Sequence, residues 1–266
     1  MRADVPSAKR LVIKVGASVL SRNGGILSRT ALRTLVNAIA PLHRRSKEIV
    51  LVSSGAIACG MEVLRLAKRP SHIHELQAAA AIGQGKLMHL YETSARRHGI
   101  HTAQILLTRE GMEPGSRRYR NAQRTLRQLL AKRVMPIVNE NDTISTEEIS
   151  FGDNDGLSAF VATMLGAECL VILTDVDGFY ITHHGKRIRL EEVRGVGKAL
   201  YMHCRSFDGQ KTVGGMASKL NAARRAARHG IPMVLADGTS ARALRRLFAG
   251  EAVGTRFLPA RKAKRP

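Results

Sequence analysis

Three amide or carboxylate side chains stand between two glycines in the segment FGDNDG, residues 151–156. They are Asp153, Asn154 and Asp155, and an apolar run follows them. Carboxylates this close repel each other unless something cationic lies among them. Two explanations stay open from these residues alone. Asp153 or Asp155 caps a helix that starts at residue 156, or the set meets a lysine, a substrate ammonium group or, through water, Mg²⁺.

Two lysines stand where they could meet a phosphate group. Lys14 lies inside the apolar run RLVIKVG, residues 10–16, where an ammonium group is costly to bury unless an anion receives it. Lys219 falls in the first turn of a helix opened by a Gly-Gly pair, and helix N-termini attract phosphate. Together they could flank a transferring phosphoryl group. The alternatives are a solvent-facing Lys14 on an edge strand, and a flexible glycine loop before a cationic surface helix.

Several familiar site classes are absent from the sequence. It contains no G-x-x-x-x-G-K-[ST] loop and no G-x-G-x-x-G between a strand and a helix. Its ten histidines form no H-E-x-x-H motif and no Cys/His group, which argues against catalytic zinc. Ser54 lacks the G-x-S-x-G elbow of serine hydrolases, so we expect it to donate a hydrogen bond rather than act as a nucleophile.

Strands and helices are expected to alternate along the chain. The strands are unbroken apolar runs at 10–16, 48–56, 99–108, 134–142, 169–178 and 231–238. Helical patterns follow a Ser28 cap and recur around 74–98 and at 120–133, 156–167 and 218–230. This alternation predicts an α/β fold with a mainly parallel sheet covered on both faces. Residues 182–187 are expected to form an exposed hairpin tip.

The polar candidates follow the expected strands. In open parallel sheets, ligands gather at the carboxyl ends of strands. The polar residues found there are Lys14 to Gly16, 53–55, 139–142, 174–178 and 236–239. The sequence therefore predicts a single site along this edge of the sheet.

The composition favours an anionic partner. The chain has 266 residues, a net charge of +22 and only 4% aromatic residues. Few aromatics and no RNA-binding signature argue against a specific nucleic-acid role, which is the alternative from another class. Three scattered cysteines, no signal peptide and no apolar run of about 20 residues predict a reduced, cytoplasmic protein with no membrane segment. We expect a disordered leader at 1–9, one domain at 10–258 and a basic tail at 259–266.

The assembled segments resemble a known family. LVIKVGASVL, IVLVSSGAIACG, LLTREGM, RNAQRTL, VMPIVNENDTIS, FGDNDGLSA, LTDVDGFY and GGMASKLNAA are similar to the glutamate 5-kinase family of the amino acid kinase superfamily, from about residue 10 to 257. The pair NEND and GDND is specific to this branch. The resemblance implies a three-layer αβα sandwich and ATP- and Mg²⁺-dependent phosphorylation of the γ-carboxylate of L-glutamate, the first step of proline synthesis. It also implies a homo-oligomer and feedback inhibition by proline.

By position, the resemblance assigns roles to individual residues. The catalytic set would be Lys14, Lys219 and Asp155. Glutamate would meet Ser54, Asn139, Asp142, Asp153 and Asn154. The nucleotide would lie against Lys14, Gly16, Thr174, Asp175, Val213, Gly214, Gly215, Met216 and Lys219. No residue is expected to act as a direct metal ligand.

Two departures from the family pattern stand out. Many bacterial members carry a C-terminal PUA domain, and we expect none in this chain. Val213 stands where the family has a threonine hydroxyl that could touch a phosphate. An amino acid kinase fold acting on another small acceptor is the alternative function. Asp142 and Asp153 disfavour UMP and isopentenyl phosphate, because carboxylates would repel these anionic acceptors.

Overall fold

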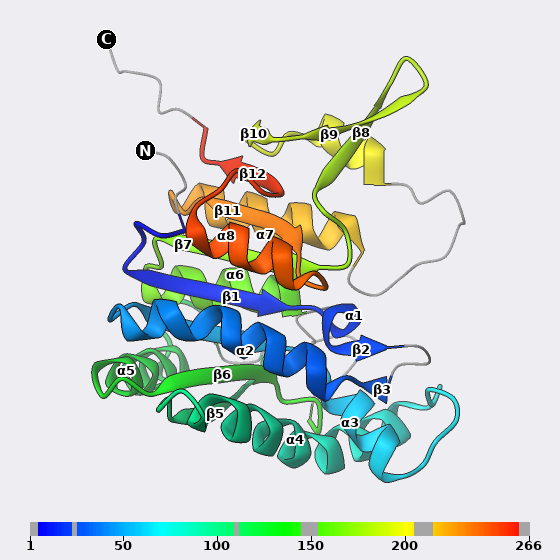
Figure 1. The fold of residues 1–266 in the computed structure, drawn as a ribbon, viewed down its shortest axis with the longest axis vertical. Helices are drawn as coiled ribbons and strands as arrows, with labels where there is room; N and C mark the ends of the chain where they lie inside the picture. The colour runs from blue at the N-terminus through cyan, green and yellow to red at the C-terminus, as the bar shows by residue number, and fades with distance from the viewer. Residues whose placement is uncertain (1–4, 23–25, 109–111, 145–153, 205–214, 261–266) are drawn as a thin grey trace.

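The structure is a computed structural model that describes residues 5–22, 26–108, 112–144, 154–204 and 215–260. Its main sheet has eight strands in the order β10-β12-β11-β7-β1-β4-β6-β5 (Figure 1). In chain order they are β1 (Arg10–Val15), β4 (Glu48–Ser53), β5 (Thr102–Leu107), β6 (Met135–Glu140), β7 (Cys169–Thr174), β10 (Glu192–Arg194), β11 (Met233–Asp237) and β12 (Thr255–Leu258). All neighbouring strands are parallel except β11 and β12, which confirms a mainly parallel sheet.

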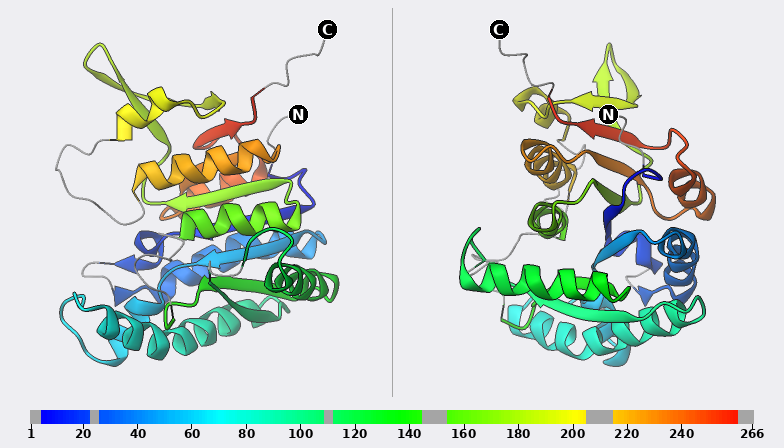
Figure 2. Two further views of the ribbon diagram at one scale, coloured as in Figure 1. Left: turned by 180° about the vertical axis from the view of Figure 1, so that it is seen from behind. Right: turned by 90° about the vertical axis from the view of Figure 1, so that its left-hand side faces the viewer.

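Helices cover both faces of the sheet, which makes three layers (Figure 2). One face packs against α2 (Arg29–Arg44), α4 (Ile73–Arg96) and α8 (Ala241–Ala249). The other packs against α5 (Arg117–Ala131), α6 (Asn154–Leu165) and α7 (Met216–Arg228). Leu11 and Ile13 of β1 join the first core cluster and Val12 joins the second, because successive strand side chains point to opposite faces. The αβα sandwich is therefore confirmed.

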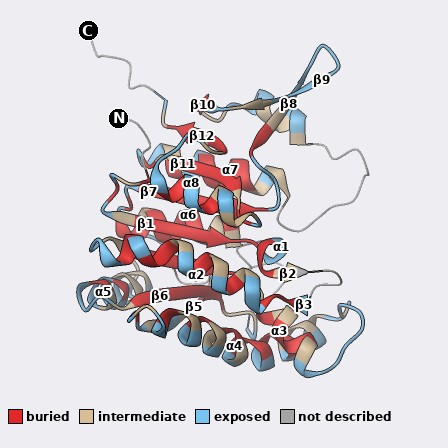
Figure 3. Ribbon diagram, in the orientation of Figure 1, coloured by how far each residue is buried: buried red, intermediate tan, exposed pale blue. Residues whose placement is uncertain are grey.

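The central strands are buried on both faces, which explains why they are unbroken apolar runs in the sequence (Figure 3). Smaller elements surround them: α1 (Ala17–Leu20), β2 (Ser21–Arg22), β3 (Ile26–Leu27), α3 (Ala56–Val63), β8 (Phe179–His183), β9 (Lys186–Leu190) and the 3-10 helix η2 (Lys198–Cys204). The expected hairpin tip is confirmed between β8 and β9. No helix in the described ranges is both long and apolar enough to cross a membrane.

Residues 5–9 differ from the disordered leader that the sequence suggests. Val5 and Ala8 are buried in the first core cluster, and Lys47 donates hydrogen bonds to the carbonyls of Pro6 and Ala8. These small apolar side chains reach the sheet, so this part of the leader packs on the domain. Residues 1–4, and 261–266 of the expected tail, lie outside the described residues.

Two glycines let α3 and α4 cross at very short range. A Cβ on Gly83 would lie 1.8 Å from the carbonyl oxygen of Ala56, and one on Gly60 would lie 1.8 Å from that of Ala79. Real Cβ atoms cannot approach a backbone oxygen this closely, so only glycine fits at either position. The crossing holds the middle of α4 against the chain that leaves β4.

Candidate functional site

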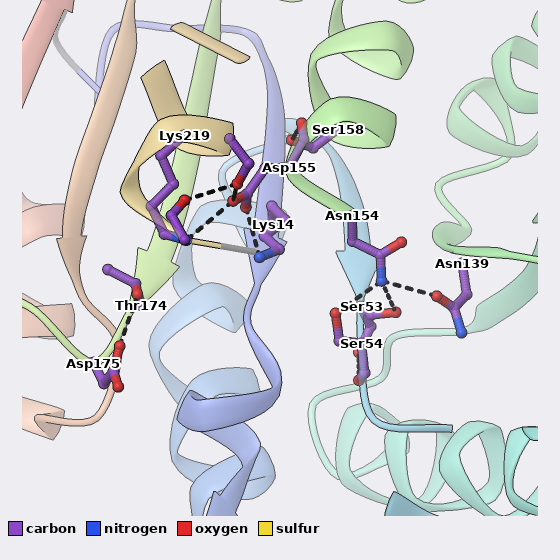
Figure 4. Close-up of polar contacts among 12 residues, drawn as sticks. Lys14, Ser53, Ser54, Asn139, Asn154, Asp155, Ser158, Thr174, Asp175 and Lys219 are labelled. Carbon is purple, nitrogen blue, oxygen red and sulfur yellow. Dashed lines mark hydrogen bonds and ion pairs between the residues drawn. The ribbon is translucent and has the colours of Figure 1, made fainter. Parts of the chain in front are cut away.

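Two buried lysines share one buried carboxylate at the carboxyl edge of the sheet. Lys14 Nζ lies 2.6 Å from Asp155 Oδ1, and Lys219 Nζ lies 3.0 Å from Asp155 Oδ2. Asp155 is 0% exposed, and the lysines are 5% and 6% exposed. Figure 4 shows the three side chains converging from β1, α6 and α7. Residues 14, 155 and 219 thus form one compact group of net charge +1.

The two cations control the ionisation of this carboxylate. Burial by itself would raise the pKa of Asp155, because it penalises the charged form. The charges of Lys14 and Lys219, with hydrogen bonds from Lys14 and Ser218, outweigh burial and hold this pKa below its usual value. Asp155 is therefore ionised at neutral pH, and the group keeps an excess positive charge that suits a phosphate.

The fold explains how these three side chains meet. β1 lies between β7 and β4, so Lys14 is on a central strand and not on a solvent-facing edge strand. Lys219 is in the first turn of α7, which Gly215 precedes in an extended conformation. Asp155 is inside the first turn of α6, which begins at Asn154 rather than at residue 156. Its side chain holds lysines and does not serve as a helix cap.

A second polar group lies beside the lysines and consists of side chains that carry no charge. Asn154 Nδ2 donates to Ser54 Oγ at 2.8 Å, to Asn139 Oδ1 at 3.0 Å and to the carbonyl of Ser53 at 3.2 Å. We call Ser54, Asn139 and Asn154 the amide group. Figure 4 shows it on the other side of α6 from the lysines. Ser54 accepts here, and no residue in the described ranges accepts the proton of its hydroxyl group, which a ligand could therefore receive.

One atom of the amide group is left with its bonding capacity unused. Asn154 Oδ1 is buried and has no hydrogen-bond partner among the described residues. Because a buried polar atom is costly without a partner, this oxygen marks a place where a ligand donor would bind. An ammonium group or an N–H would satisfy it.

Helix α4 supports the amide group through two residues that sequence reasoning missed. Asn139 Nδ2 donates to Gln84 Oε1 at 3.0 Å. Tyr91 and Ser53 share a hydrogen bond of 2.8 Å, and burial raises the pKa of Tyr91. Residues 84 and 91 are two turns apart on one helix face, but the helix carries many other polar side chains, so no local signal in the sequence sets these two apart.

Asp142 follows β6 and lies beside a cavity. It is half-buried, and burial, together with the nearby charge of Glu140, raises its pKa to about 6, although Arg69 opposes the shift. The cavity has a volume of about 230 Å³ and runs between α4, β5 and the end of β6. Gln84, Glu140 and Asp142 all contribute to its wall. The carboxylates give this part of the site a preference for a cation.

The residues expected at the nucleotide also lie at this edge. Thr174 is the last residue of β7 and Asp175 follows the strand, and Thr174 Oγ1 donates to Asp175 Oδ1 at 2.9 Å. A Cβ on Gly16 would lie 3.3 Å from the carbonyl of Leu173, so glycine permits close backbone approach there. Gly215 and Met216 open α7. Asp153, Val213 and Gly214 lie outside the described residues. Within the described ranges, no three His, Cys, Asp or Glu side chains group as metal ligands would.

Comparisons with known proteins agree with this geometry. The sequence model of the Amino acid kinase family matches residues 9–237. A glutamate 5-kinase from Nitrosococcus oceani is 46% identical over 264 residues, which cover 98% of this chain and 70% of the relative. One from Pseudomonas fluorescens is also 46% identical, over 98% of this chain and 71% of the relative.

Solved structures share the fold at much lower identity. Carbamate kinase from Giardia lamblia, solved with AMP-PNP, is 19% identical with a TM-score of 0.67, and the match covers 95% of this chain and 99% of that one. UMP kinase from Bacillus anthracis is 15% identical with a TM-score of 0.63, over 95% and 96% of the two chains. These two likenesses concern the fold alone. From the family match and the two relatives at 46% identity, the chain belongs to the amino acid kinase family, in the branch of the glutamate 5-kinases.

Proposed function

We propose that this protein transfers the γ-phosphoryl group of ATP to the γ-carboxylate of L-glutamate, the first step of proline synthesis. The observation that carries the proposal is the pair of buried lysines on Asp155, directly beside an amide group with an unsatisfied acceptor oxygen. One half of this site suits a phosphate and the other suits an amino acid. The 46% identity to glutamate 5-kinases supports the same pairing of substrates.

In the proposed reaction, an oxygen of the glutamate γ-carboxylate attacks the γ-phosphorus of ATP. A new P–O bond forms, the bond to the bridging oxygen breaks, and ADP leaves with that electron pair. The product is the acyl phosphate L-glutamyl 5-phosphate. The carboxylate attacks directly, so no covalent enzyme intermediate is needed, and Ser54 is not required as a nucleophile.

Lys14 and Lys219 would neutralise the charge that spreads over the transferred group. Phosphoryl transfer depends mainly on positioning and on such electrostatic stabilisation. Asp155 would fix both ammonium groups before the substrate arrives, because each already contacts one of its oxygens. The lysines are thus proposed as catalytic residues and Asp155 as the residue that orients them.

The acceptor would be held by its amino-acid end. Asn154 Oδ1 and the carboxylate of Asp142 would receive the α-ammonium group, with Asp153 as a further acidic partner. Ser54 and Asn139 would hold polar atoms of the same substrate. A phosphate ester is disfavoured as the acceptor substrate, because the carboxylates of Asp142 and Asp153 would repel its negative charge.

The nucleotide would lie along the ends of β1 and β7 and the start of α7. Gly16, Thr174 and Asp175 are proposed to face it, and the loop of Val213, Gly214, Gly215 and Met216 to cover its phosphates. Proteins bind Mg²⁺ mostly through substrate phosphates and one or two carboxylates. Asp175 is exposed at the strand end and could reach such an ion through water. The ion would supply further neutralisation of phosphate charge.

Release of ADP with a set of candidate acceptors tests the proposal. We expect release with L-glutamate and Mg²⁺, little with L-aspartate or UMP, and loss of activity when Mg²⁺ is chelated. The product should react with hydroxylamine to give a hydroxamate, as acyl phosphates do. Turnover of UMP without turnover of glutamate would overturn the choice of acceptor. Assembly into a homo-oligomer, inhibition by proline and a cytoplasmic location stay predictions.

A further inference from the structure

Gln84 is a buried polar residue in the apolar part of α4. It is 8% exposed, and its helix neighbours on the same face, Ala80 and Leu87, are buried in the core. Its Oε1 accepts the hydrogen bond from Asn139 Nδ2, and its Nε2 is buried without a partner among the described residues. A leucine or methionine would fill the same space but would leave Asn139 Nδ2 without its acceptor, so the amide of Gln84 serves the hydrogen bonding of Asn139 and not packing alone.

The explanation lies in the chain of hydrogen bonds that joins the side-chain amides of Gln84, Asn139 and Asn154. An asparagine side chain has an oxygen that accepts and a nitrogen that donates, on opposite sides. Gln84 takes the nitrogen of Asn139, so Asn139 presents its oxygen to Asn154. Asn154 therefore turns its nitrogen inward, and its Oδ1 is the atom left over. Gln84 thus sets the orientation of the Asn154 amide through Asn139.

The opposite orientation would be wrong for the proposed acceptor. If Asn139 turned over, its nitrogen would face the nitrogen of Asn154, and two donors would meet. Asn154 could relieve this conflict by turning over as well, and it would then aim an N–H at the substrate ammonium group. The carbonyl of Ser53 and Ser54 Oγ also receive Asn154 Nδ2, so they oppose such a turn. The effect of Gln84 should accordingly be partial rather than total.

We propose that Gln84 is a positioning residue for the amino-acid half of the site. It keeps the acceptor oxygen of Asn154 directed at the α-ammonium group of glutamate, and it touches neither the phosphoryl group nor the lysines. This inference rests on the proposed function, because it assumes that the ligand brings an ammonium group. It adds a specific contribution from α4 to the binding of the acceptor.

The position of Gln84 is itself fixed by backbone packing. It follows Gly83, whose missing Cβ allows α4 to lie against Ala56 just after β4. Two turns further along the same helix, Tyr91 bonds to Ser53. The helix therefore contacts the ends of both β4 and β6 as a rigid body, and Gln84 has little freedom to move away from Asn139.

Steady-state kinetics with three variants test the proposal. Gln84→Met keeps the length of the side chain and removes the hydrogen bond, whereas Gln84→Glu keeps an acceptor oxygen for Asn139. Gln104→Met is the matched control, because Gln104 lines the same cavity and no hydrogen bond joins it to the amide group within the described residues. We expect Gln84→Met to raise the glutamate KM about tenfold, which corresponds to about 1.4 kcal/mol. Its kcat and ATP KM should change less than about twofold, because phosphoryl transfer is untouched.

The two other variants separate orientation from simple packing. Gln84→Glu should keep the glutamate KM within about threefold of wild type, since one retained acceptor preserves the polarity of the chain of amides. Gln104→Met should match wild type. An unchanged glutamate KM in Gln84→Met, or a KM raised equally by Gln84→Glu, would overturn the proposal. A fall in kcat at constant KM would also contradict it.

A double-variant cycle gives the decisive readout. In an Asn154→Ala background the last amide is gone, so Gln84→Met should cause no further change in glutamate KM. Additive effects would refute the proposed link. Gln84→Leu removes the same hydrogen bond with a different apolar side chain, and it carries the test if Gln84→Met does not fold. Failure of the wild-type protein to use glutamate would instead refute the proposed function, so the two failures are distinct.

Discussion

Replacing Asp155 by asparagine should destabilise the protein strongly, because it leaves two buried ammonium groups without a counter-charge. At an effective dielectric constant of about 20, unit charges at the observed 2.6 and 3.0 Å attract by about 6 and 5.5 kcal/mol. Desolvation of the ions cancels much of this. Breaking a buried ion pair typically costs about 3–5 kcal/mol, so we expect a loss of about that size in the free energy of unfolding.

Urea denaturation at pH 7 measures the effect. The slope against urea should be the same for both proteins, so that a shift of midpoint reports stability. The control is Asp177→Asn, which removes a surface contact to Arg189 at 3.4 Å from a side chain that is 54% exposed. That change should cost less than about 1 kcal/mol. Equal losses in the two variants would refute our account of the lysine pair.

The same pair of proteins gives a pH test with a definite sign. The pKa of Asp155 is held below its usual 3.8, so its stabilising contribution is present above pH 3.8 and is lost as the pH falls through the lower folded value. The stability difference between wild type and Asp155→Asn should therefore be constant near neutrality and shrink in strong acid. A non-hydrolysable ATP analogue should raise the melting temperature of the variant more than that of wild type, because phosphate replaces the missing negative charge.

Three further predictions concern Lys219, Asp142 and the crossing of α3 and α4 at Gly83. Lys219→Ala should lower kcat by about 10²–10³ with little change in glutamate KM, and an unchanged kcat would show that this lysine is not catalytic. Because the pKa of Asp142 is raised to about 6, its carboxyl group becomes neutral as the pH falls below that value, and the kcat/KM for glutamate should fall with the pH. The Asp142→Asn variant should have a lower kcat/KM at neutral pH, and its kcat/KM should not show this fall in acid. Gly83→Ala should destabilise the protein by about 1–3 kcal/mol through overpacking against α3, whereas Gly85→Ala, with no heavy atom within 4 Å of its Cβ, should stabilise it slightly. A stabilising Gly83→Ala would contradict the described crossing.

The main sheet could be predicted from the sequence because its strands are buried on both faces. Runs such as residues 169–173 carry apolar side chains at every position, and that pattern is visible without a structure. β12 was missed because it has four residues, and its neighbour in the chain is the strongly basic helix α8. The alternation of strands and helices continues through β11, α8 and β12, so it does not reveal that β12 pairs antiparallel to β11.

The site was only partly predictable for a related reason. Lys14 and Asp155 can each be identified from the sequence as candidate site residues, because a charged residue inside or beside an apolar run is unusual. Gln84 could not, because glutamine is common on exposed helix faces and residues 74–98 are rich in alanine and polar side chains. Its role depends on the order of β4 and β6 in the sheet and on the glycine crossing, neither of which a local pattern encodes.

The two halves of the site meet at neighbouring residues, and this fixes their separation. Asn154 and Asp155 are consecutive in the first turn of α6, so their side chains diverge by about 100° around the helix. Asn154 therefore faces Ser54 and Asn139, and Asp155 faces the two lysines. Because the helix backbone between them is rigid, the acceptor amine and the transferring phosphoryl group would be held at a set distance. Inserting a residue between positions 154 and 155 should consequently abolish phosphoryl transfer even where each substrate still binds alone.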